Sequence, residues 1–242
     1  MIKHEHQQPR RAALARNGTR RNTAARFGLC GLLAISSLFW GGCATARTPR
    51  TTSDAGHYQP DNVYRSNLRL PLDVRRVAVL PISIEKGDWS ADAGRTELEH
   101  ALLSELAKSK TFETVVVSSE QMSGWTHRPS WKADEVLPAN FLSQVQKTTG
   151  CDAVLFAHLR PYHAYTPLVM GWNLKLAEIR SGAILWSADE VFDAIEDSVA
   201  KSAMDYQRRH VKAAVDGSAI LSSPRLFGQY TLSALLATLP GR

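Results

Sequence analysis

The chain has 242 residues and a formal net charge of +6, from 29 basic and 23 acidic side chains. Residues 1–42 hold seven of the basic and one of the acidic side chains, so the rest of the chain carries 22 of each and is neutral. A body without excess positive charge excludes a basic nucleic-acid-binding domain. A hydrophobic fraction of 44% and a charged fraction of 21% also exclude a body that is disordered throughout.

The first 42 residues have the pattern of a secretory signal peptide. Residues 1–26 are polar and rich in arginine, and Phe27–Trp40 is an almost uninterrupted apolar run. A basic segment, a short apolar segment and small residues at the cleavage position are typical of such a signal. The apolar run is shorter than the about 20 residues that span a bilayer, so we expect it to be cleaved off.

The segment around Cys43 resembles the bacterial lipobox, in which a cysteine after small residues is diacylated and becomes the first residue of the mature chain. Gly41 and Gly42 fit the small positions, whereas Trp40 stands where leucine is usual. The resemblance implies lipidation of Cys43, and two or three acyl chains anchor a protein stably because each buried methylene contributes about 0.8 kcal/mol. Ala44 follows in place of aspartate, which implies the inner leaflet of the outer membrane, facing the periplasm.

Two other interpretations of the leader stay open. The first is an ordinary cleaved signal beside which Cys43 is incidental. The second concerns the export route, because Thr19–Arg21 faintly resembles a twin-arginine signal but lacks the hydrophobic residue expected directly after the arginine pair.

Cysteine usage agrees with export. Cys30 leaves with the leader and Cys43 is acylated, so Cys151 alone remains and no internal disulfide can form. Because Cys151 begins an apolar run, we expect a buried and unreactive thiol.

After the leader, the sequence predicts a flexible tether over residues 43–70 and one folded domain over residues 71–242. The tether is rich in threonine, serine, arginine and proline, and the apolar pattern begins only at Arg76. The remaining length is enough for one domain with a sizeable core. We therefore expect a fragment that starts near Leu70 to fold, as a monomer or with weak association.

In chain order, the domain shows strand and helix patterns in alternation, then a hairpin and two helices. The expected elements are strands at 76–82, 112–117, 151–159, 168–179 and 183–192, helices at 92–108, 137–149, 198–214 and 224–239, and a long surface loop at 118–132. This order predicts an α/β fold in which a βαβαβ unit with parallel strands is extended by an antiparallel hairpin. The result is a five-stranded mixed sheet with C-terminal helices.

Three segments within residues 75–193 resemble a known group of periplasmic domains. They are Arg76–Ile82 (RVAVLPI), Thr148–Leu159 (TTGCDAVLFAHL) and Ser181–Phe192 (SGAILWSADEVF). The pattern is similar to the domain shared by curli-secretion-channel lipoproteins of the CsgG type, penicillin-binding-protein activator lipoproteins and the N-terminal domain of TolB. The resemblance implies an envelope lipoprotein with this α/β fold, and it specifies the fold better than the function.

No sequence motif of a hydrolase, a zinc protease or a nucleotide-binding protein occurs. The best candidate site is the segment with His158, Tyr162, His163 and Tyr165, where the two histidines would hold a metal if they converged with Asp152. Because the histidines are five residues apart, they point to opposite faces of a strand, which favours a polar strand end. We expect no catalytic residue, no metal and no cofactor.

Five tryptophans belong to the body of the protein. Trp172 and Trp186 lie on strand faces and are expected in the core. Trp89, Trp125 and Trp131 lie in predicted loops, where exposed aromatic rings are typical of contacts with a partner protein or of stacking on a sugar.

These patterns favour a non-enzymatic lipoprotein of the cell envelope that binds a protein partner during envelope assembly or secretion, with self-association possible. One alternative is a protein that binds or hydrolyses cell-wall sugar through the aromatic loops. Another is a CsgG-type secretion pore subunit. The pore is disfavoured because membrane strands need about 10 alternating residues each, and only the predicted hairpin at 168–192 alternates.

Lipidation of Cys43 can be tested directly. Mass spectrometry of the mature protein should find a diacylglyceryl-modified Cys43 as the first residue, because the small residues before it end the apolar segment. An N-terminus at unmodified Ala44, or a retained leader, would contradict the prediction.

Overall fold

The computed structural model describes residues 57–210 and 217–242. The leader, Cys43 and the first half of the expected tether lie outside these ranges, as do the last residues of the helix expected at 198–214. The strands are β1 (Val63–Arg65), β2 (Arg76–Val79), β3 (Ser83–Ile84), β4 (Glu113–Val116), β5 (Ala153–His163), β6 (Val169–Glu178) and β7 (Ile184–Asp193). The helices are α1 (Trp89–Ser109), α2 (Ser119–Thr126), α3 (Phe141–Thr149), α4 (Asp197–His210) and α5 (Pro224–Leu236), with a 3-10 helix at Gly217–Ser222. Within these two ranges, no helix has both the length and the apolar character that crossing a membrane requires.

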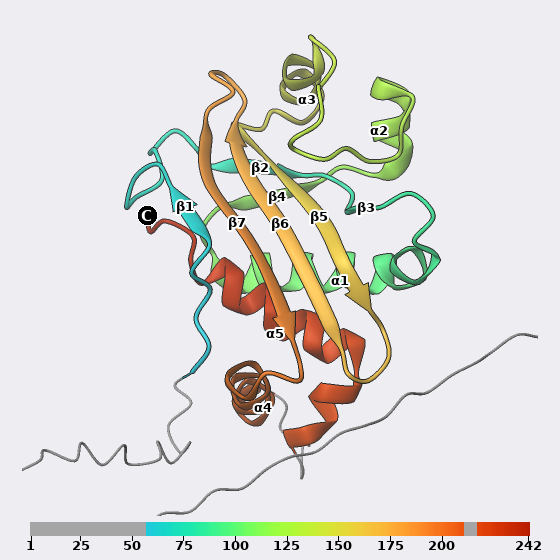
Figure 1. The fold of residues 1–242 in the computed structure, drawn as a ribbon. Helices are drawn as coiled ribbons and strands as arrows, with labels where there is room; N and C mark the ends of the chain where they lie inside the picture. The colour runs from blue at the N-terminus through green and yellow to red at the C-terminus, as the bar shows by residue number, and fades with distance from the viewer. Residues whose placement is uncertain (1–56, 211–216) are drawn as a thin grey trace, which may run out of the picture. The chain divides into compact units, whose positions relative to one another are not determined.

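The strands form one mixed sheet in the order β1-β7-β6-β5-β2-β4, and β3 pairs with β5 (Figure 1). Strand β2 is parallel to both β4 and β5, with α1 leading to β4 and with α2 and α3 leading to β5. Strands β5, β6 and β7 are antiparallel neighbours. The predicted α/β class, βαβαβ unit, hairpin and C-terminal helices are confirmed, and β1 and β3 raise the number of strands from five to seven.

Strand β1 lies inside the segment that the sequence predicts as a tether, so that prediction is wrong for its last part. Val63–Arg65 pairs antiparallel with β7. Upstream, the backbone N–H of Tyr58 donates to the Ser202 hydroxyl at 2.7 Å, and the Tyr58 ring packs on Phe192 with centroids 5.1 Å apart. A three-residue strand held largely by backbone hydrogen bonds leaves no apolar period in the sequence. The domain therefore includes the chain from Tyr58 onward.

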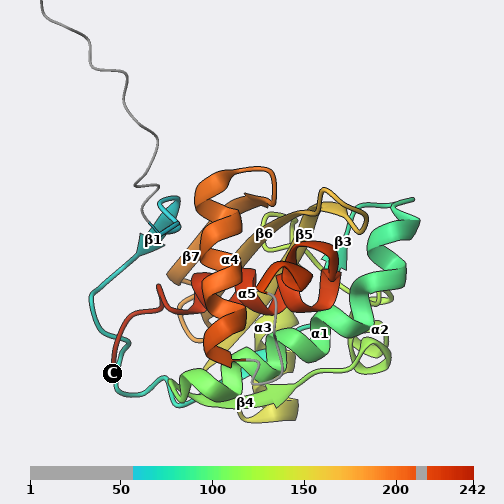
Figure 2. The same cartoon turned by 90° about the horizontal axis from the view of Figure 1, so that it is seen from below.

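Helices cover both faces of the sheet. Helices α1, α4 and α5 pack on one face and build the larger core with alternate residues of β6, among them Met170, Trp172 and Leu174. Helices α2 and α3 cover part of the other face, where Phe141 and Cys151 belong to a smaller core. Figures 1 and 2 show α1 and α5 behind the long strands β5–β7, with α2 and α3 near one end of the sheet. The predicted burial of Cys151 is confirmed, and this burial raises the pKa of its thiol.

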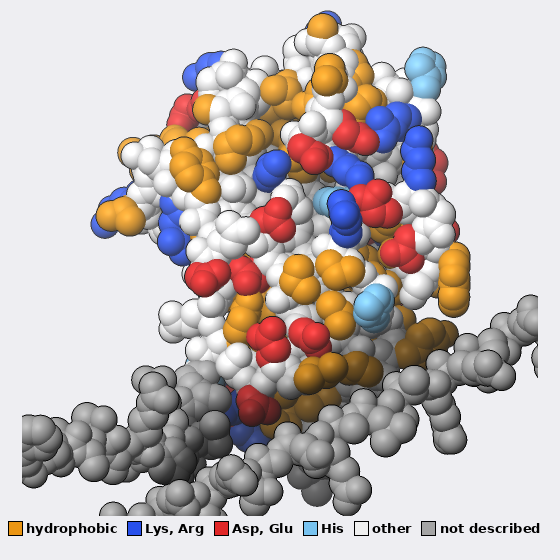
Figure 3. All heavy atoms as spheres, viewed as in Figure 1, with side chains coloured by type: hydrophobic (Ala, Val, Ile, Leu, Met, Phe, Trp, Pro, Cys, Tyr) orange, Lys and Arg blue, Asp and Glu red, His pale blue; other side chains and the backbone are white. Residues whose placement is uncertain are grey.

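The second face of β6 and β7 is the wetter one that the sequence predicts. Asn173 and Lys175 are partly exposed there, and the Asn173 side-chain amide donates to the Asp189 carboxylate at 2.7 Å. Figure 3 shows charged side chains of both signs scattered over the face seen in that view. The alternation of the hairpin thus separates a buried apolar face from a polar one.

Helix α1 packs against the sheet and against α5 at two places where only glycine fits. A Cβ atom added at Gly94 would collide with the ring and hydroxyl of Tyr162, at the end of β5. A Cβ atom added at Gly228 of α5 would collide with the Leu98 side chain of α1. These two contacts fix the position of α1 between the sheet and α5.

The core positions predicted for Trp172 and Trp186 are confirmed. Both side chains are fully buried, and their indole N–H groups donate to the hydroxyls of Thr231 and Thr238 at 3.0 and 3.1 Å. These bonds tie the strands to α5 and to the segment directly after it. A buried indole with a satisfied N–H contributes its full apolar area to the core.

Replacement of Trp172 by alanine should lower the free energy of unfolding by about 3–5 kcal/mol, because it removes a buried ring and leaves a cavity. Denaturant unfolding followed by circular dichroism measures the change. Trp89→Ala is the matched control, since Trp89 is exposed, and it should shift the stability by less than about 0.5 kcal/mol. Equal losses in the two variants would contradict the assigned burial.

Candidate functional site

The three tryptophans predicted in exposed loops have different surroundings. Trp89 is the first residue of α1 and its side chain is 73% exposed. Trp131 is only 9% exposed, and Trp125 is half-buried against the smaller core. The prediction of an exposed loop tryptophan is therefore wrong for Trp125 and Trp131.

The reason is helix α2, which occupies most of the segment predicted as a long loop at 118–132. Its N-terminus has a capping box in which the Ser118 hydroxyl accepts from the Gln121 N–H and the Gln121 side chain accepts from the Ser118 N–H. Serine followed three residues later by glutamine is a recognisable helix start, so this signal was present in the sequence. The helix is short and contains Gly124, and its apolar period is correspondingly weak.

Trp131 serves as a packing residue beside this helix. The Arg128 guanidinium lies over its ring, 4.0 Å from the centroid, and the same guanidinium bonds both oxygens of Glu135 at 2.8 and 3.2 Å. The cation covers the outer face of the indole while the other side faces the core. Little of the Trp131 side chain therefore remains exposed to a partner.

Trp89 is held in place by the start of its helix. The Asp88 carboxylate caps α1 by accepting from the Ala91 N–H at 2.9 Å. One turn further on, Gly94 lies against Tyr162 at the end of β5. The exposed indole therefore stands on an anchored helix end, beside the turn that joins β5 and β6.

A shallow hollow of about 660 Å³ lies between Trp89 and this turn. Its lining includes Arg160, His163 and Tyr165 from the end of β5 and the turn, and Tyr165 is as exposed as Trp89. We call Trp89, Arg160, His163 and Tyr165 the Trp89 surface. It joins two segments more than 60 residues apart, and it presents two aromatic rings beside a guanidinium and an imidazole.

Below this surface, Glu85 connects the loop before α1 to β5. Its carboxylate oxygen Oε1 lies 2.6 Å from Lys132 Nζ, 3.3 Å from His158 Nε2 and 3.5 Å from an Arg160 guanidinium nitrogen. The Lys132 hydrogen bond, aided by the charge of His158, lowers the pKa of Glu85. The ion pair with Glu85 is the contact that places the Arg160 guanidinium at the edge of the Trp89 surface.

The residues considered for a metal site do not converge. Asp152 precedes β5 and accepts the backbone N–H groups of Arg75 and Arg76 at 2.9 and 3.0 Å, whereas His163 ends the same strand. His158 faces the Ser83 carbonyl through Nδ1 at 3.0 Å. Among the residues that the structure describes, no three acidic, histidine or cysteine side chains come together as a metal would need.

Of the segment singled out from the sequence, the structure brings His163 and Tyr165 to the Trp89 surface. Tyr162 instead lies in the core, where burial raises the pKa of its hydroxyl. Arg160 is the member of this surface that the sequence reasoning missed. Its position could have been predicted from the parallel pairing of β2 and β5. Parallel strands end at the same edge of a sheet, so the end of β5 lies near the residues that follow β2.

No family model matches the sequence, and no curated protein matches it. Several solved structures are similar at low identity. PelC from Paraburkholderia phytofirmans, described as a dodecamer, is 14% identical with a TM-score of 0.42, over 74% of this chain and 98% of PelC. Lipoprotein GNA1162 from Neisseria meningitidis is 16% identical with a TM-score of 0.35, over 58% of this chain and 99% of its own. The C-terminal domain of LpoB from Escherichia coli is 16% identical with a TM-score of 0.31, over 49% and 82%.

The sequence resembles the N-terminal domain of TolB, and TolB from Acinetobacter baumannii is among the matched structures. The structures similar to this chain thus include a bacterial lipoprotein and TolB. Membership of the curli-secretion-channel group stays a prediction.

The glycine contact that positions Trp89 can be tested by Gly94→Ala. The added methyl group meets Tyr162, so the free energy of unfolding should fall by about 1–3 kcal/mol in a denaturant titration. Gly124→Ala in α2 is the control, since nothing lies within 4 Å of its added Cβ, and stability should stay unchanged or rise by up to about 1 kcal/mol. If Gly94→Ala is as stable as the parent, α1 is not held against β5 in this way.

Proposed function

We propose that this protein is a lipoprotein of the bacterial envelope, anchored through Cys43 to the inner leaflet of the outer membrane. Its α/β domain faces the periplasm and binds a protein partner in envelope assembly or secretion, without enzymatic activity. The contact with the partner is made by the Trp89 surface.

The observation that carries this proposal is the exposure of Trp89 on a fixed helix end, next to the equally exposed Tyr165. Leaving two large aromatic rings in water is unfavourable, and burying them against a partner recovers that free energy. Tryptophan, tyrosine and arginine are the residues most enriched at binding hot spots, and the Trp89 surface contains all three. Because α1 is already ordered, little conformational entropy is lost when a partner binds.

The anchor is argued from the leader. The apolar run and the small residues before Cys43 favour acylation of that cysteine. Thirteen residues lie between Cys43 and His57, the first described residue, and at about 3.3–3.6 Å per residue a fully extended chain of this length would reach at most roughly 50 Å. This length lets the domain reach a partner while the acyl chains stay in the membrane.

The same hollow also favours a second candidate, the binding of a cell-wall sugar. Trp89 and Tyr165 offer ring faces on which a sugar stacks, and His163 and Arg160 offer hydrogen bonds to hydroxyl groups. The two candidates share one surface and differ in the ligand that it takes. One double variant therefore tests both candidates.

Trp89→Ala combined with Tyr165→Ala should abolish co-purification of the partner from detergent-solubilised envelopes, identified by mass spectrometry. The expected loss is about 2 kcal/mol or more, roughly 30-fold in affinity, because both rings lie in the contact. Val136→Ala is the control, since Val136 is almost fully exposed in the connection between α2 and α3. Thermal stability should be unchanged in all variants.

The opposite outcomes are also informative. A partner that co-purifies equally with the double variant would place the contact elsewhere. Binding of a purified wall glycan that is lost in the double variant would favour the sugar-binding candidate. Turnover of that glycan, lost on replacement of His158 or His163, would support an enzyme instead.

A further inference from the structure

The sheet has two edges without a further strand among the described residues. Strand β4 pairs only with β2, and β1 pairs only with β7. The free backbone groups of an exposed edge strand can pair with another chain. What lies beside each edge therefore decides whether that edge takes part in an interaction.

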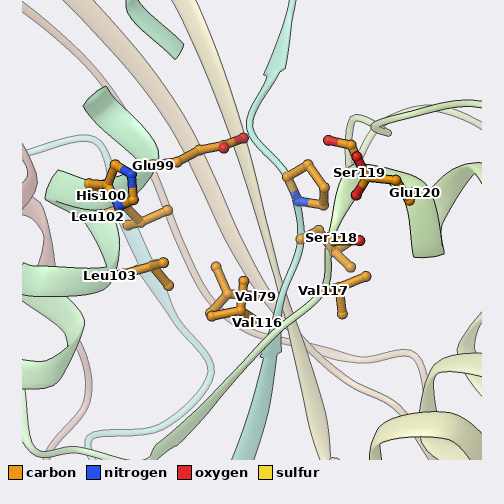
Figure 4. Close-up of a pocket in the computed structure, with 12 residues that line it drawn as sticks. Val79, Glu99, His100, Leu102, Leu103, Val116, Val117, Ser118, Ser119 and Glu120 are labelled. Atoms are coloured by element: carbon orange, nitrogen blue, oxygen red, sulfur yellow. The ribbon is translucent and has the colours of Figure 1, made fainter. Parts of the chain in front are cut away.

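Beside β4 the surface forms an apolar groove (Figure 4). Val79 and Val116 project from the strands toward Leu102 and Leu103 of α1, around a cavity of about 320 Å³. Val116 is 56% exposed, on the edge strand itself. The groove is thus an apolar hollow at the carboxyl ends of β2 and of the edge strand β4, with α1 as its other wall.

The rim of this groove is acidic. Glu99 and Glu120 line it together with His100, no lysine or arginine does, and one Glu99 oxygen also accepts the Ile82 N–H at 3.1 Å. A hydrogen bond with the Ser118 side chain lowers the pKa of Glu120. We call Val79, Leu102, Leu103 and Val116, with Glu99 and Glu120, the β4 groove.

The connection between β1 and β2 has the opposite character. Leu68 is 87% exposed and Leu72 is 81% exposed, and the two lie four residues apart on one connection. The two leucines flank Arg69, and Arg65 and Arg75 are exposed nearby. Asp73 is the acidic side chain within this stretch. We call residues 66–75 the leucine loop; Arg65, the last residue of β1, lies directly before it and donates to the Thr238 carbonyl.

The leucine loop is held in place by the C-terminus. The Leu70 N–H donates to the Gly241 carbonyl at 2.9 Å, and the Gly241 N–H donates to the Leu68 carbonyl at 3.1 Å. Leu70 itself is buried in the larger core. The exposed leucines are therefore presented by ordered backbone and not by a free end.

We propose that these two features bind each other between two copies of this chain. Leu68 and Leu72 of one copy enter the β4 groove of the next, and Arg65 and Arg69 approach Glu99 and Glu120. The exposed leucines of one copy contact the apolar lining of the groove in the other copy, and the arginines beside the leucines lie next to the glutamates of the groove. Because the two contacting patches differ, the contact is head-to-tail, and each copy keeps a free groove or a free loop for another copy. The Trp89 surface takes no part in this contact.

The test uses the full chain, purified in detergent and studied by sedimentation velocity with correction for bound detergent. The parent protein should form assemblies larger than a dimer. Leu68→Asp with Leu72→Asp should lose self-association at least about tenfold, and so should Val116→Asp, because each places a carboxylate in the contact. A mixture of the two variants should form a one-to-one dimer and nothing larger, since each supplies the half that the other lacks.

Val136→Asp is the matched control, because it adds the same charge at an exposed valine that belongs neither to the groove lining nor to the leucine loop, and it should assemble like the parent. Trp89→Ala should also assemble like the parent, which separates this proposal from that of the partner surface.

In intact cells, Leu68→Cys in one copy and Val116→Cys in another should form a disulfide between copies, whereas Val136→Cys should not replace Val116→Cys. The cysteine pair keeps the test valid if an aspartate variant fails to fold. A parent protein that is monomeric at every concentration, aspartate variants that still assemble, or a mixture that forms no dimer would each overturn the proposal.

Discussion

The close packing of α1, at two contacts where only glycine fits, is the constraint on which the outer surfaces of the domain depend. Gly94 lets the helix approach Tyr162 at the end of β5, and Gly228 lets α5 approach Leu98. With 21 residues at about 1.5 Å each, the helix is roughly 30 Å long. Its first residue, Trp89, stands at the end of β5, and its middle part forms one wall of the groove beside β4. A shift of this one helix would therefore alter both surfaces together.

The two surfaces differ in chemistry as well as in place. The Trp89 surface combines aromatic rings with a guanidinium and an imidazole, over a carboxylate that several basic groups share. The β4 groove is aliphatic with an acidic rim. Surfaces of such different character select different ligands, because an unpaired charge or a desolvated polar group penalises the wrong one. A protein with both can assemble with itself and still keep its aromatic surface free for a partner.

The tryptophans show how far sequence reasoning reaches at a functional site. Trp172 and Trp186 lie on strands with a clear two-residue period, and that period assigned them to the core. Trp89 was assigned to the surface because it follows the first strand and precedes the helical pattern. Trp131 could not be placed in this way, because its burial depends on the Arg128 side chain and on a short helix with a weak apolar period. Local pattern carries no information about which side chain comes to lie over a ring.

The sequence by itself determined the five strands β2, β4, β5, β6 and β7, the helices between and after them apart from α2, and the apolar face of the hairpin, since each depends on neighbours within about ten residues. Only the tertiary structure decided that residues 58–65 belong to the domain, because β1 pairs with the edge of β7 and the Tyr58 N–H donates to the Ser202 hydroxyl, each more than 100 residues away. It also decided that Trp89 and Tyr165 share one hollow. The physical reason is the same in each case: periodicity records which face of an element is buried, whereas the contacts at its ends and edges depend on distant parts of the chain.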